Sequence, residues 1–145
     1  MLNIQGIIVK GESSASGKNM NWNGFGSIYH QVNFLKNNHL QFAKKLIDCK
    51  MATINIKLNN SFTPKYWEYT FDKVFWLPDS NAWSEKLSFT SIQFIFKNKQ
   101  IDAWLYKAYK SPHCNDNYLI EVLAPLIENL NTHEVCEIAI NKKYI

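Results

Sequence analysis

The stretch Thr53-Ile54-Asn55-Ile56-Lys57-Leu58 decides the fold class, because apolar and polar side chains alternate along it without a break. Side chains two residues apart in a strand point to the same face, so the three apolar residues share one face and the three polar residues share the other. This pattern is typical of a sheet that covers a core on one side and faces solvent on the other. The following pair, Asn59-Asn60, ends the predicted strand.

The segments on either side of this strand predict further short strands. Residues 4–9 are rich in β-branched side chains and are followed by Gly11, while Ile92, Phe94 and Phe96 alternate along a second run. A polar turn at 97–100 separates that run from another apolar run, which predicts a β-hairpin although the turn contains no glycine. The strands are therefore expected at residues 4–9, 53–58, 92–96, 101–109, 118–123 and 136–140, with short strands and loops over 61–87.

One main α-helix is expected near residues 38–49. Asn37 or Asn38 can cap it, because an asparagine side chain accepts a hydrogen bond from a free backbone N–H, and Leu40, Ala43 and Ile47 follow at helical spacing. A single helical turn is expected at 126–131. Many short strands with one helix predict a mainly β protein folded as a closed or nearly closed barrel.

The composition fits one domain over residues 1–145, with 46% hydrophobic and 14% aromatic residues to build a core. No run approaches the roughly 20 apolar residues of a membrane span, and Met1–Lys10 lacks the pattern of a secretory signal. The three cysteines, Cys49, Cys114 and Cys136, are too scattered for a disulfide framework or a cysteine-based zinc site. We therefore expect a cytoplasmic protein with reduced thiols and no membrane partner.

All 16 basic residues are lysines, and the net charge is +4. Nucleic-acid-binding proteins usually use arginine for bidentate contacts with bases and phosphates, so we expect no nucleic-acid partner. A mildly positive protein can still attract a phosphorylated small molecule.

Thr53 and Asn55 form the first candidate site. Their i, i+2 spacing on a strand places both side chains on one face, about 6.5 to 7 Å apart along the chain. A hydroxyl and an amide oxygen are hard ligands, which together with phosphate oxygens and waters suit Mg²⁺. The alternative is an ordinary strand with a polar outer face.

The second candidate is the glycine- and serine-containing segment that follows the first strand. Small residues let backbone N–H groups approach phosphates closely, although the spacing is not that of a Walker A loop. The alternative is a plain flexible loop. The residues expected to bind a nucleotide are Lys10, Gly11, Glu12, Ser13, Ser14, Ala15, Ser16 and Lys18.

The third candidate combines Pro112 and His113 with Glu121, a carboxylate inside an apolar strand. Such a carboxylate can accept the proton of a substrate hydroxyl or hydrogen-bond a polyol. We predict Glu121 as the catalytic residue and Pro112, His113 and Glu121 as substrate-binding residues. The alternative for Glu121 is an exposed position on a strand.

Taken in order, the motifs resemble those of the archaeal-type CTP-dependent riboflavin kinases. That family begins with a strand close to G-x-V-x-x-G and a glycine-rich loop, followed by a strand close to G-T-L-N-V-K-L and later by L-E-I-I-A-P. The corresponding segments here are 6–11 (GIIVKG), 52–58 (ATINIKL), 112–113 (PH), 120–126 (IEVLAPL) and 133–138 (HEVCEI). The matches span nearly the whole chain, but the family loop G-x-G-E-G reads Gly11-Glu12-Ser13-Ser14-Ala15 in this chain.

The resemblance implies a riboflavin-kinase-like cradle-loop β-barrel. It implies transfer of the γ-phosphate of CTP, or of another nucleoside triphosphate, to riboflavin or a related hydroxyl acceptor, giving FMN. It also implies Mg²⁺ on Thr53 and Asn55, and nucleotide phosphates on the segment that begins at Gly11. The altered loop leaves an alternative open, namely a non-catalytic flavin- or nucleotide-binding relative that acts as a sensor or interaction module.

Overall fold

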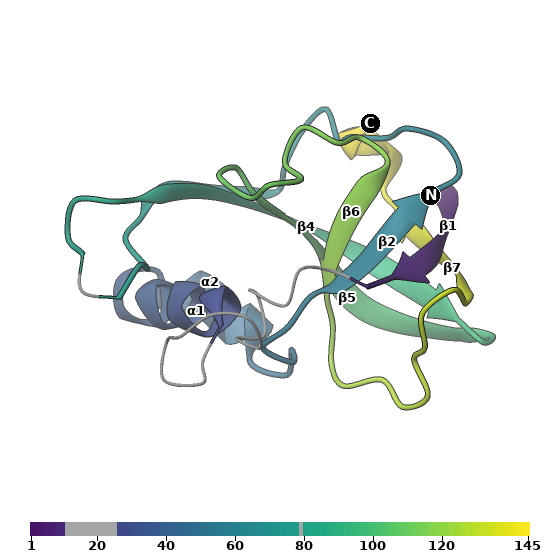
Figure 1. Ribbon diagram of the computed structural model, residues 1–145, viewed down its shortest axis with the longest axis horizontal. Coiled ribbons are helices and arrows are strands. Elements are labelled where there is room, and N and C mark those ends of the chain that lie inside the picture. Colours follow the sequence, from purple (N-terminus) through teal and green to yellow (C-terminus); the bar gives the residue numbers. More distant parts are fainter. Residues whose placement is uncertain (11–25, 79) are drawn as a thin grey trace.

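The computed structural model describes residues 1–10, 26–78 and 80–145 (Figure 1). Within these residues the protein is mainly β, and seven antiparallel strands form one sheet in the order β3-β4-β5-β6-β2-β1-β7. The strands are β1 (Leu2–Val9), β2 (Ile54–Leu58), β3 (Tyr69–Val74), β4 (Glu85–Phe96), β5 (Lys99–Ala108), β6 (Leu119–Leu123) and β7 (Val135–Ile140).

The sheet closes on itself, because β4 pairs with β7 as well as with β3 and β5. Six strands therefore form a closed ring, and β3 extends the sheet outside it. The N-terminal half of β4 also runs beyond the ring to pair with β3. The prediction of a mainly β fold is thus confirmed, with every predicted strand present at close to its expected position.

The alternating stretch that decided the fold class lies as predicted. Ile56 and Leu58 in β2 are buried inside the ring, with 1% and 3% of their surface exposed, while Lys57 between them is exposed. They pack there with Phe94 from β4 and Ile138 from β7. The apolar faces of strands far apart in sequence therefore meet in one core.

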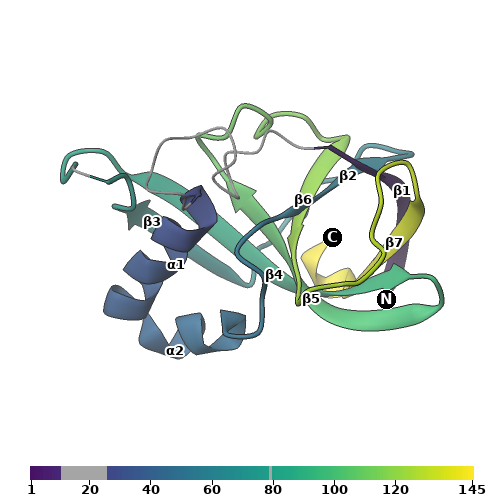
Figure 2. The same cartoon turned by 60° about the horizontal axis from the view of Figure 1, so that its bottom comes forward.

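A second core lies outside the ring, where two helices cover the extension formed by β3, β4 and β5 (Figure 2). The helices are α1 (Ser27–Asn38) and α2 (Leu40–Ala43), and a 3₁₀ turn at Lys44–Leu46 follows α2. Phe42 of α2 packs against Tyr69 and Phe89, with ring centroids 4.7 and 4.8 Å away. A second 3₁₀ turn, at Lys142–Tyr144, follows β7.

The prediction of one main helix at 38–49 is wrong in its position. The longer helix is α1, and the backbone leaves the helical conformation at His39, with φ −142° and ψ 56°. Asn38 does not cap the following helix, because its side-chain amide donates to the Phe34 carbonyl within α1. Residues 126–131 contain a turn at 128–129 and not the predicted helical turn.

The turn of the β4–β5 hairpin forms without glycine. Lys97 and Asn98 both have positive φ, 49° and 65°. Two such residues in succession match the backbone twist of a tight two-residue hairpin turn. Asparagine tolerates this conformation better than most residues, which explains why the polar turn still forms.

Candidate functional site

A continuous row of residues crosses four strands on the outer face of the ring. Asn55 of β2 pairs with Val9 of β1 on one side and with Glu121 of β6 on the other. Glu121 pairs in turn with Tyr106 of β5. Directly opposed residues in antiparallel strands point to the same face with Cβ atoms about 4.5 to 5.5 Å apart. The register therefore brings the amide, the carboxylate and the phenol side by side.

Thr53, which precedes β2, joins this row through its side chain. Its Oγ1 donates a hydrogen bond to Glu121 Oε1 at 2.9 Å. A hydroxyl that gives its proton in this way keeps its lone pairs for another partner. Two residues chosen from separate sequence patterns, one as a metal ligand and one as a catalytic residue, are thus in direct contact.

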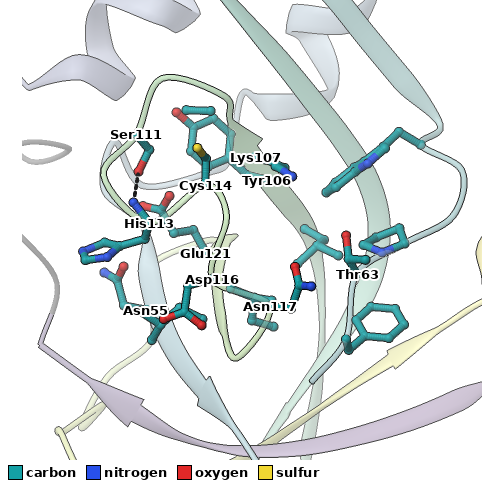
Figure 3. Close-up of a pocket in the computed structure, with 17 residues that line it drawn as sticks. Asn55, Thr63, Tyr106, Lys107, Ser111, His113, Cys114, Asp116, Asn117 and Glu121 are labelled. Atoms are coloured by element: carbon teal, nitrogen blue, oxygen red, sulfur yellow. Dashed lines mark hydrogen bonds between the residues drawn. The ribbon is translucent and has the colours of Figure 1, made fainter. Parts of the chain in front are cut away.

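The segment between β5 and β6 covers this row and encloses a small cavity of about 50 Å³ (Figure 3). His113 lies in this segment, and its backbone N–H donates to Ser111 Oγ at 3.4 Å. The polar side chains around the cavity come from β2, β5, β6 and two loops, namely Asn55, Thr63, Lys107, Ser111, His113, Cys114, Asp116, Asn117 and Glu121.

Burial is the main influence on the protonation of Glu121. It raises the pKa of this carboxyl above the usual value, while the hydrogen bond from Thr53 and the nearby His113 act in the opposite direction. The negative charge of Glu85 raises the pKa further. A carboxylate whose pKa is moved toward neutrality is better suited to accept a proton during a reaction than one with the ordinary value.

Tyr106 forms one wall of the site and was not predicted from the sequence. It is buried, and its hydroxyl donates to Gln31 Oε1 of α1 at 2.6 Å. Burial, followed by the charges of Glu121 and Glu85, holds its pKa well above the usual value, so Tyr106 stays neutral. Nothing in its local sequence distinguishes it from the other aromatic residues in the strands.

Thr53, Asn55 and Glu121 form a set of three hard oxygen donors. Among residues 1–10, 26–78 and 80–145, no group of three histidine, cysteine or acidic side chains is arranged to hold a metal ion. A set of one carboxylate, one amide and one hydroxyl nevertheless fits Mg²⁺, which retains several waters and takes the remaining oxygens from phosphates. The residues therefore suit Mg²⁺ held jointly with a phosphorylated ligand, and not a permanently bound metal.

A second cavity of about 180 Å³ adjoins Thr53 and Asn55 on the other side. Lys50 stands at this cavity, whose other walls are mostly apolar, and Asn55 lines both cavities. The remaining lining residues are Ile8, Val9, Ala52, Ile54, Ala124, Pro125, Leu126, Ile127 and Leu130. The predicted metal ligands thus lie between a polar cavity and an apolar one.

The other predicted site residues divide into two groups. Lys10 is exposed and follows Val9, the residue paired with Asn55, so the chain leaves β1 next to the predicted metal ligands. Pro112 lies in the segment that carries His113 but does not line the polar cavity. Gly11, Glu12, Ser13, Ser14, Ala15, Ser16 and Lys18 lie outside the described residues.

All three cysteines lie in the described part of the chain, and none forms a disulfide. Neither α1 nor α2, nor any other helix in the described ranges, has the length and apolar character needed to cross a bilayer. No protein-family model matches this chain, and no curated protein sequence is significantly similar to it.

Proposed function

We propose that the protein is a Mg²⁺-dependent small-molecule kinase of the riboflavin-kinase type, built on a cradle-loop β-barrel. It transfers the γ-phosphate of CTP, or of another nucleoside triphosphate, to a hydroxyl of riboflavin or a related acceptor. The observation that carries the proposal is the direct contact between Thr53 and Glu121, with Asn55 paired beside them. This contact supports the proposal, because the predicted metal ligands and the predicted proton acceptor are neighbours.

The two cavities support a division between donor and acceptor. The apolar cavity borders the end of β1, where the nucleotide-binding segment is expected to begin, and is suited to a nucleobase. The polar cavity contains Glu121 and His113, which suit a polyol chain. At about 50 Å³ it holds little more than one or two water-sized groups, so only the hydroxyl end of the acceptor enters it and a flavin ring stays outside.

The chemistry requires mainly positioning and charge stabilisation, as is general for phosphoryl transfer. The acceptor oxygen forms a bond to the γ-phosphorus while the bond to the bridging oxygen of the nucleotide breaks, and Glu121 takes the hydroxyl proton. Thr53 orients Glu121 through its hydrogen bond, and Thr53 and Asn55 also offer oxygens to Mg²⁺. When bound, the metal neutralises charge on the phosphates.

The second candidate function is a non-catalytic flavin- or nucleotide-binding protein. The sequence Glu12-Ser13-Ser14-Ala15 favours it, because a Cβ at the positions of the missing glycines hinders a close approach of the backbone to phosphates. This alternative predicts ligand binding with no turnover.

The test is to incubate the protein with Mg²⁺, riboflavin and either CTP or ATP, and to separate FMN by chromatography. Glu121→Gln should reduce turnover by roughly a hundredfold or more, because it removes the proton acceptor. Glu137→Gln is the matched control, since among the described residues Glu137 accepts hydrogen bonds from exposed Asn3 and Gln5 alone, on the opposite side of the ring. Binding of riboflavin or nucleotide without any FMN would favour the non-catalytic alternative, and no binding of either would refute both.

A further inference from the structure

A buried carboxylate lies where the segment that covers the candidate site begins. Glu85, the first residue of β4, has only 3% of its surface exposed and forms no ion pair among the described residues. Burying a charge is costly unless hydrogen bonds or a nearby cation compensate it, and for Glu85 the compensation comes from two hydrogen bonds and from the charge of Lys110. It is hydrogen-bonded to Trp76 of the second core and does not line the cavity that contains Glu121.

Both oxygens of Glu85 accept N–H groups from separate parts of the chain. Trp76 Nε1 donates to Oε1 at 2.9 Å, and the backbone N–H of Lys110 donates to Oε2 at 2.6 Å. Burial raises the pKa of this carboxyl, whereas the two hydrogen bonds and the positive charge of Lys110 lower it. The carboxylate therefore joins the chain that precedes β4 to the chain that leaves β5.

Lys110 is held at this place by its side chain as well. Its Nζ donates to the Ser84 carbonyl at 2.6 Å and lies 4.8 Å from the centroid of the Trp83 ring. The Trp83 ring in turn packs edge-to-face against Trp76, with centroids 5.1 Å apart. The backbone and the side chain of one residue are thus both attached to the stretch next to Glu85.

The segment that begins at Lys110 is the one that carries the acceptor side of the site. Ser111 follows directly, and its hydroxyl accepts the backbone N–H of His113. His113 lies close enough to Glu121 to lower the pKa of that carboxyl. Because Lys110 is held in place, the start of the short segment that leads to His113 is held in place as well.

We propose that Glu85 is a positioning residue for the acceptor pocket, which it orders by holding Lys110 and thereby the segment that places Ser111 and His113 beside Glu121. Glu85 does not line the acceptor pocket, and apart from the effect of its charge on the pKa of Glu121 it acts through this segment. The kinetic part of the inference rests on the proposed function, whereas its structural part does not.

The test uses Glu85→Gln together with Trp76→Phe. A glutamine offers one acceptor where two N–H donors converge, so one donor faces the side-chain NH₂ group and is left unpaired. Hydrogen exchange at the amides of Lys110, Ser111 and Cys114 should accelerate by about tenfold or more, in line with the penalty for an unpaired buried donor. In the double variant, phenylalanine removes the indole donor, and exchange should return toward the wild-type rate.

A role confined to general stability predicts a different pattern. If Glu85 only stabilised the fold as a whole, Glu85→Gln would accelerate exchange equally at strand amides remote from the segment, such as Ile138. That result would overturn the inference. Wild-type exchange at Lys110 in Glu85→Gln would also overturn it. Trp76→Phe alone keeps the bond to Lys110 and should give the same local pattern at smaller amplitude, so the test remains decisive if Glu85→Gln does not fold.

The kinetic measurement separates this inference from the proposed function. If FMN is formed, Glu85→Gln should raise the KM for riboflavin about tenfold or more and leave the KM for the nucleotide unchanged, while Glu137→Gln changes neither. An equal rise in both KM values would contradict the positioning role. If no FMN is formed by the wild-type protein, the kinase proposal fails, but the local exchange pattern still decides whether Glu85 orders the segment.

Discussion

Replacing Thr53 by valine tests the centre of the candidate site most directly. Valine has nearly the same shape as threonine, so the change removes the hydroxyl that donates to Glu121 Oε1 at 2.9 Å and leaves the packing almost unaltered. A hydrogen bond to a charged group contributes about 1.5 to 3 kcal/mol, and one to a neutral group about 0.5 to 1.5 kcal/mol. The cost of Thr53→Val should therefore depend on whether Glu121 is ionised.

The sign of this pH dependence follows from the environment of Glu121. Its pKa in the folded protein is raised above the ordinary value, so the folded state binds the proton more tightly than the unfolded chain does. Stability from this group is fully present below the unfolded pKa and is lost as pH rises through the folded pKa. Because the Thr53 bond lowers the pKa, Thr53→Val raises it further and makes that loss larger.

The assay is urea unfolding of the wild-type and Thr53→Val proteins between pH 4 and pH 8. The difference in unfolding free energy should grow from about 1 kcal/mol at low pH to about 2 kcal/mol at high pH. Asn55→Leu is the comparison, since it alters the same face and leaves the hydrogen bond between Thr53 and Glu121 in place. A difference that stays constant with pH would refute the assigned contact between the hydroxyl and an ionising Glu121.

The same variant has a larger expected effect on catalysis than on folding. If Thr53 supplies a metal ligand, its loss removes charge stabilisation of several kcal/mol in the transition state. That corresponds to a drop in turnover of about a thousandfold or more, accompanied by weaker Mg²⁺-dependent binding of nucleotide. A Thr53→Val protein that stays folded under the assay conditions and binds nucleotide with unchanged Mg²⁺ dependence would exclude the metal site at this position.

Three further outcomes are expected. Turnover of the wild-type protein should rise with pH through the raised pKa of Glu121, and Glu121→Gln should lose this dependence in a pH–rate profile. Gly6→Ala should lower the unfolding free energy by about 1 to 3 kcal/mol in a denaturant titration, because the new Cβ would lie 2.5 Å from a carbonyl oxygen of β2. In a thiol-labelling time course at pH 8, Cys114 should react first, since burial raises the pKa of Cys49 and Cys136 to about 11; simultaneous labelling of all three would contradict this order.

The strands were predictable because their pattern is local. In β2, burial alternates with a period of two residues, and the same period identified the runs that became β4 and β7. The positions of α1 and α2 were harder to predict from the sequence, although Ile28, Val32 and Leu35 of α1 do lie at helical spacing. The sequence analysis assigns no element to residues 27–37, whereas in the structure the apolar face of α1 packs against β3 and β4 in the second core.

For the candidate site too, the sequence predicted the residues but not their arrangement. Residue type and strand alternation were enough to select Thr53, Asn55 and Glu121, because hard oxygen donors on one strand face and a carboxylate in an apolar strand are visible in the sequence. Their adjacency was not visible. It depends on the register between β2 and β6, which are separated by three other strands in the chain.

The sequence by itself indicated where most of the strands lie and which face of β2 is buried, since both follow from side-chain alternation within a few residues. The strand β3 was expected only within a region of short strands and loops. Only the tertiary structure decided that the ring closes between β4 and β7, that Thr53 contacts Glu121, and that Glu85 holds Lys110. These are pairings between distant segments, and their register is chosen by how all the apolar faces fill one core together. No local pattern contains that information, because each strand would alternate in the same way in a different partner order.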